Sequence, residues 1–170
     1  MRIQNFGGAG MKTVLSVLCI MAIVAMVAVV AFAGETARDG RFIAYDNGTV
    51  LDTKTNLMWA ARDNGGDIIW QNAQSYIEQY RRGGYTDWRL PTVDELAELY
   101  DARKPRTAAC GVNYKIFVAT ELIDITCDSP WASETGGSDA AYFGFNSGRR
   151  KWGPKSDSFG GRALPVRSVR

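Results

Sequence analysis

Residues 83–101 have the sequence GGYTDWRLPTVDELAELYD, which marks the start of a helix more clearly than any other part of the chain. Thr92 and Glu95 have the spacing of a capping box, in which each side chain accepts a hydrogen bond from a backbone N–H that the first turn leaves free. Pro91 immediately precedes the box. The pattern predicts a helix that ends at residues 103–106. Its predicted buried face carries Val93, Leu96, Leu99 and Tyr100.

A second amphipathic helix is predicted earlier in the chain, where apolar side chains recur at helical spacing among polar ones. The side chains that set this period are Trp70, Ala73, Ile77 and Tyr80. The pair Gly83-Gly84 follows and is typical of a helix C-terminus.

Short strands are predicted on both sides of the two helices. In residues 41–60, Asn47-Gly48 is typical of a two-residue hairpin turn with both residues at positive φ, and residues 52–56 form a second polar turn. Residues 114–118 are predicted to be a short strand, whereas residues 126–138 have the composition of an acidic loop.

The C-terminal part of the chain predicts another hairpin and a last strand. Residues 141–145 and 149–152 flank a turn at Asn146-Ser147-Gly148, and residues 166–169 follow Pro165. Strands, then two helices, then strands is an α+β layout, with the helices packed on short antiparallel strands.

The N-terminal segment has the pattern of a signal peptide over residues 1–33. An apolar run at residues 14–33 follows Lys12 and ends in Ala31-Phe32-Ala33, which is typical of a cleavage site. Met11 is an alternative start. Cleavage leaves a domain of residues 34–170, either periplasmic or extracellular. The alternative is an inner-membrane anchor, because about 20 apolar residues span a bilayer; only this leader is expected to contact a membrane.

Charge and cysteine content exclude several functions. The chain has no histidine, so neither a Ser–His or Cys–His nucleophile nor a histidine-ligated zinc site can be built from it. Cys110 and Cys127 are the two cysteines after the leader and predict one disulfide in an oxidising compartment, worth about 3 kcal/mol. No catalytic or nucleic-acid-binding motif is recognisable, although a two-carboxylate glycosidase has no sequence signature that would exclude it.

The exported part is neutral overall, but its charges are segregated. Residues 146–170 contain seven basic side chains and one acidic one, whereas residues 116–145 contain five acidic side chains and no basic one. Arg149-Arg150-Lys151-Trp152 is expected to face a glycan or another anionic polymer. The alternative is a solvated strand whose charges are matched by the acidic segment. The candidate ligand-binding residues, which include aromatic stacking faces, are Trp131, Glu134, Tyr142, Asn146, Arg149, Arg150, Lys151 and Trp152.

The residues around Trp88 are expected to have a structural role. We expect Asp87 and Arg89 to form an ion pair that organises the turn, with Trp88 in the core, rather than to grip an anionic ligand. Together with the capping residues, the structural motif is Asp87, Trp88, Arg89, Pro91, Thr92 and Glu95.

No metal or cofactor is expected. The acidic loop suggests calcium as an alternative, since hard cations take several oxygen ligands. However, the chain contains neither a D-x-D-x-D-G loop nor the Glu-Pro-Asn, Gln-Pro-Asp or Trp-Asn-Asp signatures of calcium-dependent sugar binding.

Several of these segments together resemble the Lcl C-terminal domain family. They are DNGTVLDTKTNLMW (46–59), WQNAQSYIEQY (70–80), GGYTDWRLPTVDELAELYD (83–101), PWASET (130–135) and VRSVR (166–170). The resemblance implies a C-type-lectin-like fold related to the formylglycine-generating-enzyme type, in exported bacterial proteins for which glycan binding is the suggested activity. Ser168 departs from the family, which often has cysteine there; this implies a different disulfide arrangement, with Cys110 and Cys127 as the available pair.

We therefore expect an exported, non-catalytic binding or adhesion module that recognises a glycan or an anionic surface polymer. One alternative is a structural or protein-interaction domain of a cell-envelope assembly. The other is a glycan-active enzyme that works through carboxylates.

Overall fold

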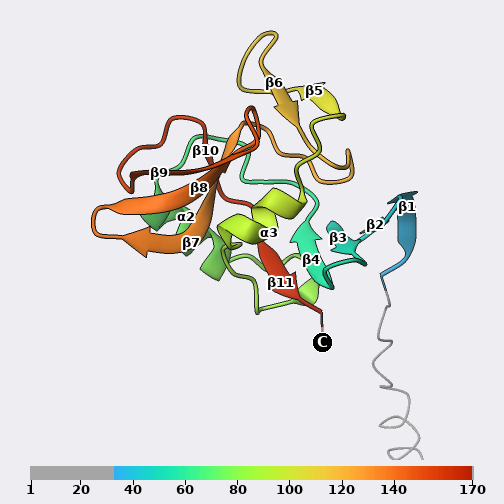
Figure 1. Ribbon diagram of the computed structural model, residues 1–170. Coiled ribbons are helices and arrows are strands. Elements are labelled where there is room, and N and C mark those ends of the chain that lie inside the picture. Colours follow the sequence, from blue (N-terminus) through green and yellow to red (C-terminus); the bar gives the residue numbers. More distant parts are fainter. Residues whose placement is uncertain (1–32, 170) are drawn as a thin grey trace, which may run out of the picture. The chain divides into compact units, whose positions relative to one another are not determined.

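The computed structural model describes residues 33–169 of the chain (Figure 1). The predicted signal peptide, its alternative start at Met11 and its alternative role as an anchor therefore lie outside the described residues, except for Ala33. Within residues 33–169, no helix is long and apolar enough to cross a membrane.

The first sheet has five antiparallel strands in the order β1-β2-β3-β4-β11. Its strands are β1 (Glu35–Asp39), β2 (Phe42–Tyr45), β3 (Thr49–Asp52), β4 (Leu57–Ala60) and β11 (Val166–Ser168). This confirms the meander and the last strand, which pairs Val166 with Trp59. Strand β1 was not predicted, because its side chains are mostly exposed and give no alternating apolar pattern.

The turn between β2 and β3 differs from its prediction. Ala44 pairs with Val50, so three residues, 46–48, form the loop instead of two. Gly48 has a φ of 78°, whereas Asn47 is outside the left-handed region. The two-residue turn was therefore wrong: a three-residue loop needs only one residue at positive φ, and the glycine takes that position.

Both predicted helices are confirmed as α2 (Trp70–Glu78) and α3 (Val93–Glu98), with the short 3₁₀ turn η1 (Arg82–Gly84) between them. The capping box forms: the Glu95 N–H donates to Thr92 Oγ1 at 3.1 Å, and the Thr92 N–H donates to Glu95 Oε2 at 2.8 Å. The second helix is shorter than predicted. It ends at Glu98 because the carbonyl of Leu99 accepts the Ala119 N–H at 2.7 Å instead of continuing the helical ladder.

The second sheet has the order β10-β7-β8-β9, and the third pairs β5 with β6. These strands are β5 (Pro105–Thr107), β6 (Lys115–Phe117), β7 (Ser129–Gly136), β8 (Asp139–Gly144), β9 (Arg149–Pro154) and β10 (Gly161–Arg162). The hairpin of β8 and β9 and the strand near residues 114–118 are confirmed.

The prediction of an acidic loop at residues 126–138 was wrong, because most of this segment is β7. Trp131 and Ala132 are adjacent and both buried, and the register between β7 and β8 shifts between Trp131 and Thr135. The alternation of buried and exposed side chains that normally identifies a strand is therefore lost. Figure 1 shows β7 and β8 as a long hairpin.

The core has two parts, one on each side of the second sheet. Ala141 and Phe143 of β8 pack with α3 and the first sheet, whereas Ala140 packs with α2. Strand alternation explains this division, since successive side chains of β8 point to opposite faces. The structure is thus α+β, and its two helices cover different parts of the core.

Candidate functional site

The side chains of β9 divide between the two faces of the second sheet. Lys151 is paired with Tyr142, and its Nζ lies 6.0 Å from the centroid of that ring. Arg150 points to the other face and forms an ion pair of 2.6 Å with Asp94 of α3. Trp152 follows the same alternation as Arg150, and its Cζ3 would lie 3.6 Å from a β-carbon on Gly136. The predicted basic segment is therefore not one surface.

The two tryptophans predicted as stacking faces have different environments. Trp131 is only 4% exposed, and its Nε1 donates to the carbonyl of Ile68 at 2.8 Å. Its prediction as an open stacking face was wrong, because the ring fills the core beneath the sheet. Trp152, by contrast, is 56% exposed.

Two polar residues predicted as ligand contacts are used within the fold. The carboxylate of Glu134 accepts the Val93 N–H at 3.0 and 3.2 Å, which satisfies a free donor in the first turn of α3. Asn146 donates to the Tyr114 hydroxyl at 2.7 Å, and that hydroxyl donates to Asp128 at 2.9 Å. These contacts give Glu134 and Asn146 a structural role within the fold, and the ligand-binding role predicted for them stays a prediction.

The basic cluster predicted at residues 146–170 is dispersed by folding. Arg162 is buried and donates to Asp67 at 2.7 Å, while Arg167 pairs with Asp87 at 2.6 Å. These acidic partners, like Asp94, lie outside the acidic segment at residues 116–145. Neither the single basic patch nor its matching by the acidic segment is therefore correct.

The motif around Trp88 is organised by two separate ion pairs. Arg89 donates to both oxygens of Glu95, at 2.7 and 2.6 Å, while Asp87 contacts Arg167. The predicted Asp87–Arg89 pair is thus replaced by partners from α3 and β11. Burial raises the pKa of Glu95, but hydrogen bonds from Arg89 and Thr92 outweigh this and hold that pKa below its ordinary value. Trp88 is buried, and its Nε1 donates to the carbonyl of Arg82 at 3.2 Å.

The predicted disulfide is confirmed. Cys110 and Cys127 are bonded, with their Cα atoms 5.4 Å apart. The bond joins the loop between β5 and β6 to the segment that enters β7.

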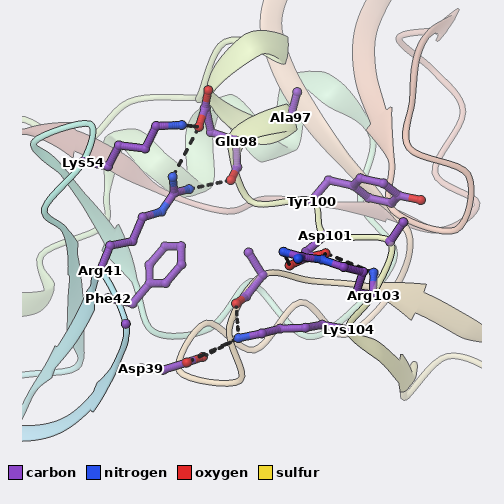
Figure 2. Close-up of a pocket in the computed structure, with 13 residues that line it drawn as sticks. Asp39, Arg41, Phe42, Lys54, Ala97, Glu98, Tyr100, Asp101, Arg103 and Lys104 are labelled. Atoms are coloured by element: carbon purple, nitrogen blue, oxygen red, sulfur yellow. Dashed lines mark hydrogen bonds and ion pairs between the residues drawn. The ribbon is translucent and has the colours of Figure 1, made fainter.

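One cleft, which we call the Glu98 cleft, has a volume of about 580 Å³ (Figure 2). Its charged side chains bind one another: Lys54 and Arg41 both reach Glu98, at 2.8 and 3.4 Å. Lys104 pairs with Asp39 at 3.2 Å, and Arg103 pairs with Asp101. The hydrogen bonds from Arg103 lower the pKa of Asp101 to about 2. This cleft therefore offers a ligand few charged groups that are not already engaged.

A smaller cleft of about 180 Å³ lies beside β8 and β9; we call it the β9 cleft. Its lining includes Trp131, Tyr142, Trp152, Gly153, Asp157 and Phe159. Phe159 is 89% exposed, and Asp157 accepts the Phe159 N–H at 3.0 Å. Burial and the nearby carboxylates of Asp128 and Asp157 raise the pKa of Tyr142.

A third cleft, of about 430 Å³, lies along α2; we call it the α2 cleft. Its lining includes Trp70, Gln74, Ile77, Glu78, Trp88 and Ser133. Ile77 and Trp88 are buried and form an apolar floor, while Gln74, Glu78 and Ser133 are exposed polar groups around it. An apolar floor with a few polar groups is the usual composition of a small-ligand site.

Part of these clefts was predicted from the sequence. Trp131, Tyr142 and Trp152 were among the predicted residues, whereas Asp157 and Phe159 were not, because an isolated phenylalanine in a polar loop has no period. The only signal was the sequence SDSFGGR at residues 156–162, where an apolar side chain is placed between turn residues. Among residues 33–169, no group of three or more histidine, cysteine, aspartate or glutamate side chains is arranged to hold a metal ion.

The fold and its clefts define a small disulfide-bonded α+β domain with aromatic surface clefts. The Lcl C-terminal domain model matches residues 48–167, and the chain belongs to this family. The match includes both helices and the two clefts beside β9 and α2. No curated protein matches the chain.

Proposed function

We propose that this protein is an exported, non-catalytic binding module that recognises a glycan through the β9 cleft. The observation that carries the proposal is the exposed aromatic ring of Phe159 beside the carboxylate of Asp157 and the hydroxyl of Tyr142. A sugar ring has an apolar face that stacks on an aromatic ring, and hydroxyls at its edge that bind carboxylates and phenols. The β9 cleft offers both kinds of contact within about 180 Å³.

The loop that carries Phe159 is held in place before any ligand binds. Asp157 accepts the Phe159 N–H, and Gly160 has a φ of 70°, a conformation that L side chains rarely adopt. A β-carbon on Gly161 would lie 2.7 Å from Trp131 Nε1, so only glycine lets the loop approach the sheet this closely. Such preorganisation supports binding because less conformational freedom is lost when the ligand arrives.

Recognition of an anionic glycan would depend on two basic side chains. Arg149 and Lys151 lie on the same face of β9 as Tyr142, and neither has an ion pair among residues 33–169. Arg150 is already paired with Asp94. A sulfated or phosphorylated glycan would therefore meet two available cations, which is few for a polyanion site.

The disulfide supports export, because such bonds persist in oxidising compartments. Two helices packed on mainly antiparallel sheets, in which only β10 and β7 pair in parallel among residues 33–169, are consistent with the proposed C-type-lectin-like fold. We further propose that binding needs no cofactor, calcium or catalytic step, so a chelator should leave it unchanged.

The test is a glycan array probed with the protein purified after expression with its own leader, followed by calorimetric titration of the best glycan. Phe159→Ala should weaken binding about tenfold or more, the loss that corresponds to about 1.4 kcal/mol of contact energy. Val112→Ala is the matched control, because Val112 is 94% exposed and does not line the cleft.

Four outcomes would count against the proposal. Absence of array signal contradicts glycan recognition, and an equal loss in both variants contradicts the assignment to the β9 cleft. The envelope-interaction alternative gains support if pull-down from envelope extract gives a defined protein partner that Phe159→Ala releases while no glycan binds. Turnover of a bound glycan would instead favour the enzyme alternative.

A further inference from the structure

The β9 cleft and the α2 cleft lie on either side of a backbone hydrogen bond between Trp70 and Lys155. Trp70 lines the α2 cleft, and its backbone N–H donates to the carbonyl of Lys155 at 3.0 Å. Pro154, the residue before Lys155, lines the β9 cleft. The Lys155 side chain covers the contact: its Nζ lies 5.3 Å from the centroid of the Trp70 ring and donates to the Gly137 carbonyl at 2.9 Å.

The two clefts also share a wall. Trp131 of β7 lines the β9 cleft, and Ser133, two residues further along the strand, lines the α2 cleft. Residues two apart in a strand are separated by about 7 Å. Two indole hydrogen bonds fix residues 68–70 against this wall: Trp131 Nε1 to the Ile68 carbonyl at 2.8 Å, and Trp70 Nε1 to the Ala132 carbonyl at 2.9 Å. The distance between the clefts is therefore set by the fold.

The charges of the two clefts are alike. Asp157 in the β9 cleft and Glu78 in the α2 cleft are exposed carboxylates with no ion pair among residues 33–169. Arg89, the cation that lines the α2 cleft, is already bound to both oxygens of Glu95. Carboxylates accept hydrogen bonds from hydroxyl groups but repel other anions. Lys155, on the ridge between the clefts, is a cation, but its Nζ is already bound to the Gly137 carbonyl. The carboxylates that line the two clefts thus suit a neutral polyhydroxylated ligand better than a polyanion.

We infer that the ligand is a neutral oligosaccharide chain, with one sugar ring against Phe159 in the β9 cleft and another on the apolar floor of the α2 cleft. The inference rests on the proposed function, since it assigns a ligand class to the same site and extends that site along β7. Trp70 and Lys155 form the ridge over which the chain passes. Because the second ring binds within an already formed complex, two weak subsites give a much higher combined affinity.

The test is a calorimetric titration series with cello-oligosaccharides and chito-oligosaccharides of increasing length, from the monomer to the hexamer. Affinity should rise about tenfold or more at the length that reaches both clefts and then level off. Heparin-derived oligosaccharides of matching length form the anionic arm, and they should bind more weakly at every length.

Single-residue variants test whether the rise in affinity with chain length comes from the α2 cleft. Gln74→Ala should remove most of the gain with length while leaving the shortest bound chain unaffected, because Gln74 lines only the α2 cleft. Gln71→Ala, an exposed glutamine of the same helix that lines neither cleft, is the matched control and should change nothing. Phe159→Ala should weaken chains of every length.

Each contrary result has its own meaning. Neutral sugars that bind with the same affinity at every length overturn the two-cleft inference and leave the proposed function intact. Heparin fragments that bind more tightly than neutral chains overturn the assignment of ligand class. Failure of all neutral chains to bind overturns the inference, and failure on the full array as well removes the proposed function.

Discussion

The Glu98 cleft and the β9 cleft differ in what their polar groups already bind. The Glu98 cleft is larger, but its cations and carboxylates are matched with each other, as Figure 2 shows for Lys54, Arg41 and Glu98. The β9 cleft is smaller, yet it exposes Phe159 and keeps Asp157 without an ion pair among residues 33–169. A binding site is therefore distinguished from a network of ion pairs by groups that are not already paired within the fold, and not by its volume.

A second difference is the environment of the charges near each cleft. Arg162 follows Gly161, which lines the β9 cleft, and it is buried beside Asp63 at 3.9 Å. Burial raises the pKa of Asp63 although hydrogen bonds from Thr126 favour the ionised form. The ion pairs of the Glu98 cleft, in contrast, are largely open to water, which screens them.

The largest effect is expected for Arg162→Met. Removing one member of a buried charged network leaves Asp63 without its cation and should cost about 3–5 kcal/mol in the free energy of unfolding. Urea denaturation followed by circular dichroism measures this. A loss below about 1 kcal/mol would show that the network beneath the β9 cleft behaves like a surface ion pair, and the energetic part of the comparison would fail.

Reduction of the disulfide should have the next largest effect. Opening the Cys110–Cys127 link should lower the free energy of unfolding by about 3 kcal/mol. It should also weaken glycan binding, because a β-carbon on Gly160 would lie 3.6 Å from Cys127 Sγ, so the Phe159 loop rests against the bond. Calorimetric titration with and without reductant tests this. Unchanged binding in a reduced but folded protein would separate the disulfide from the β9 cleft.

A smaller, pH-dependent effect is expected from Glu95. Its pKa in the folded protein is below the ordinary value of 4.5. Its stabilising contribution is therefore fully present above that value and is lost as the pH falls through the folded pKa. Loss of this cap should cost about 1 kcal/mol. The Glu95→Gln variant should lack this part of the acid sensitivity in urea titrations at neutral and acidic pH, and equal sensitivity in both proteins would contradict the assignment.

The smallest effect is expected in the Glu98 cleft. Lys54→Met breaks an exposed ion pair with Glu98 and should change the free energy of unfolding by less than about 1 kcal/mol. Its affinity for the best array glycan should equal that of the unmodified protein. A clear loss of binding would move the site to the Glu98 cleft and reverse the comparison.

The parts of the fold that sequence predicted well depend on local chemistry. The capping box of Thr92 and Glu95 and the spacing of Ala73 and Ile77 involve neighbours on one helix, so they are visible in a short window. The strand β7 was missed because its buried residues do not alternate.

The candidate site was predicted only in part, because its chemistry depends on distant partners. Arg162 reaches Asp67 across 95 positions, and Arg167 reaches Asp87 across 80, so part of the basic cluster in the sequence became separate ion pairs. Neighbours along β9 point to opposite faces, which separated Arg150 from Lys151.

The most direct test of the central claim is an NMR titration of the ¹⁵N-labelled protein with the glycan that gives the strongest array signal. The account predicts that the largest amide shifts fall on Tyr142 and on residues 152–161, around the β9 cleft. Shifts concentrated at Lys54 and Glu98 of the Glu98 cleft, or no shifts at saturating glycan, would contradict it.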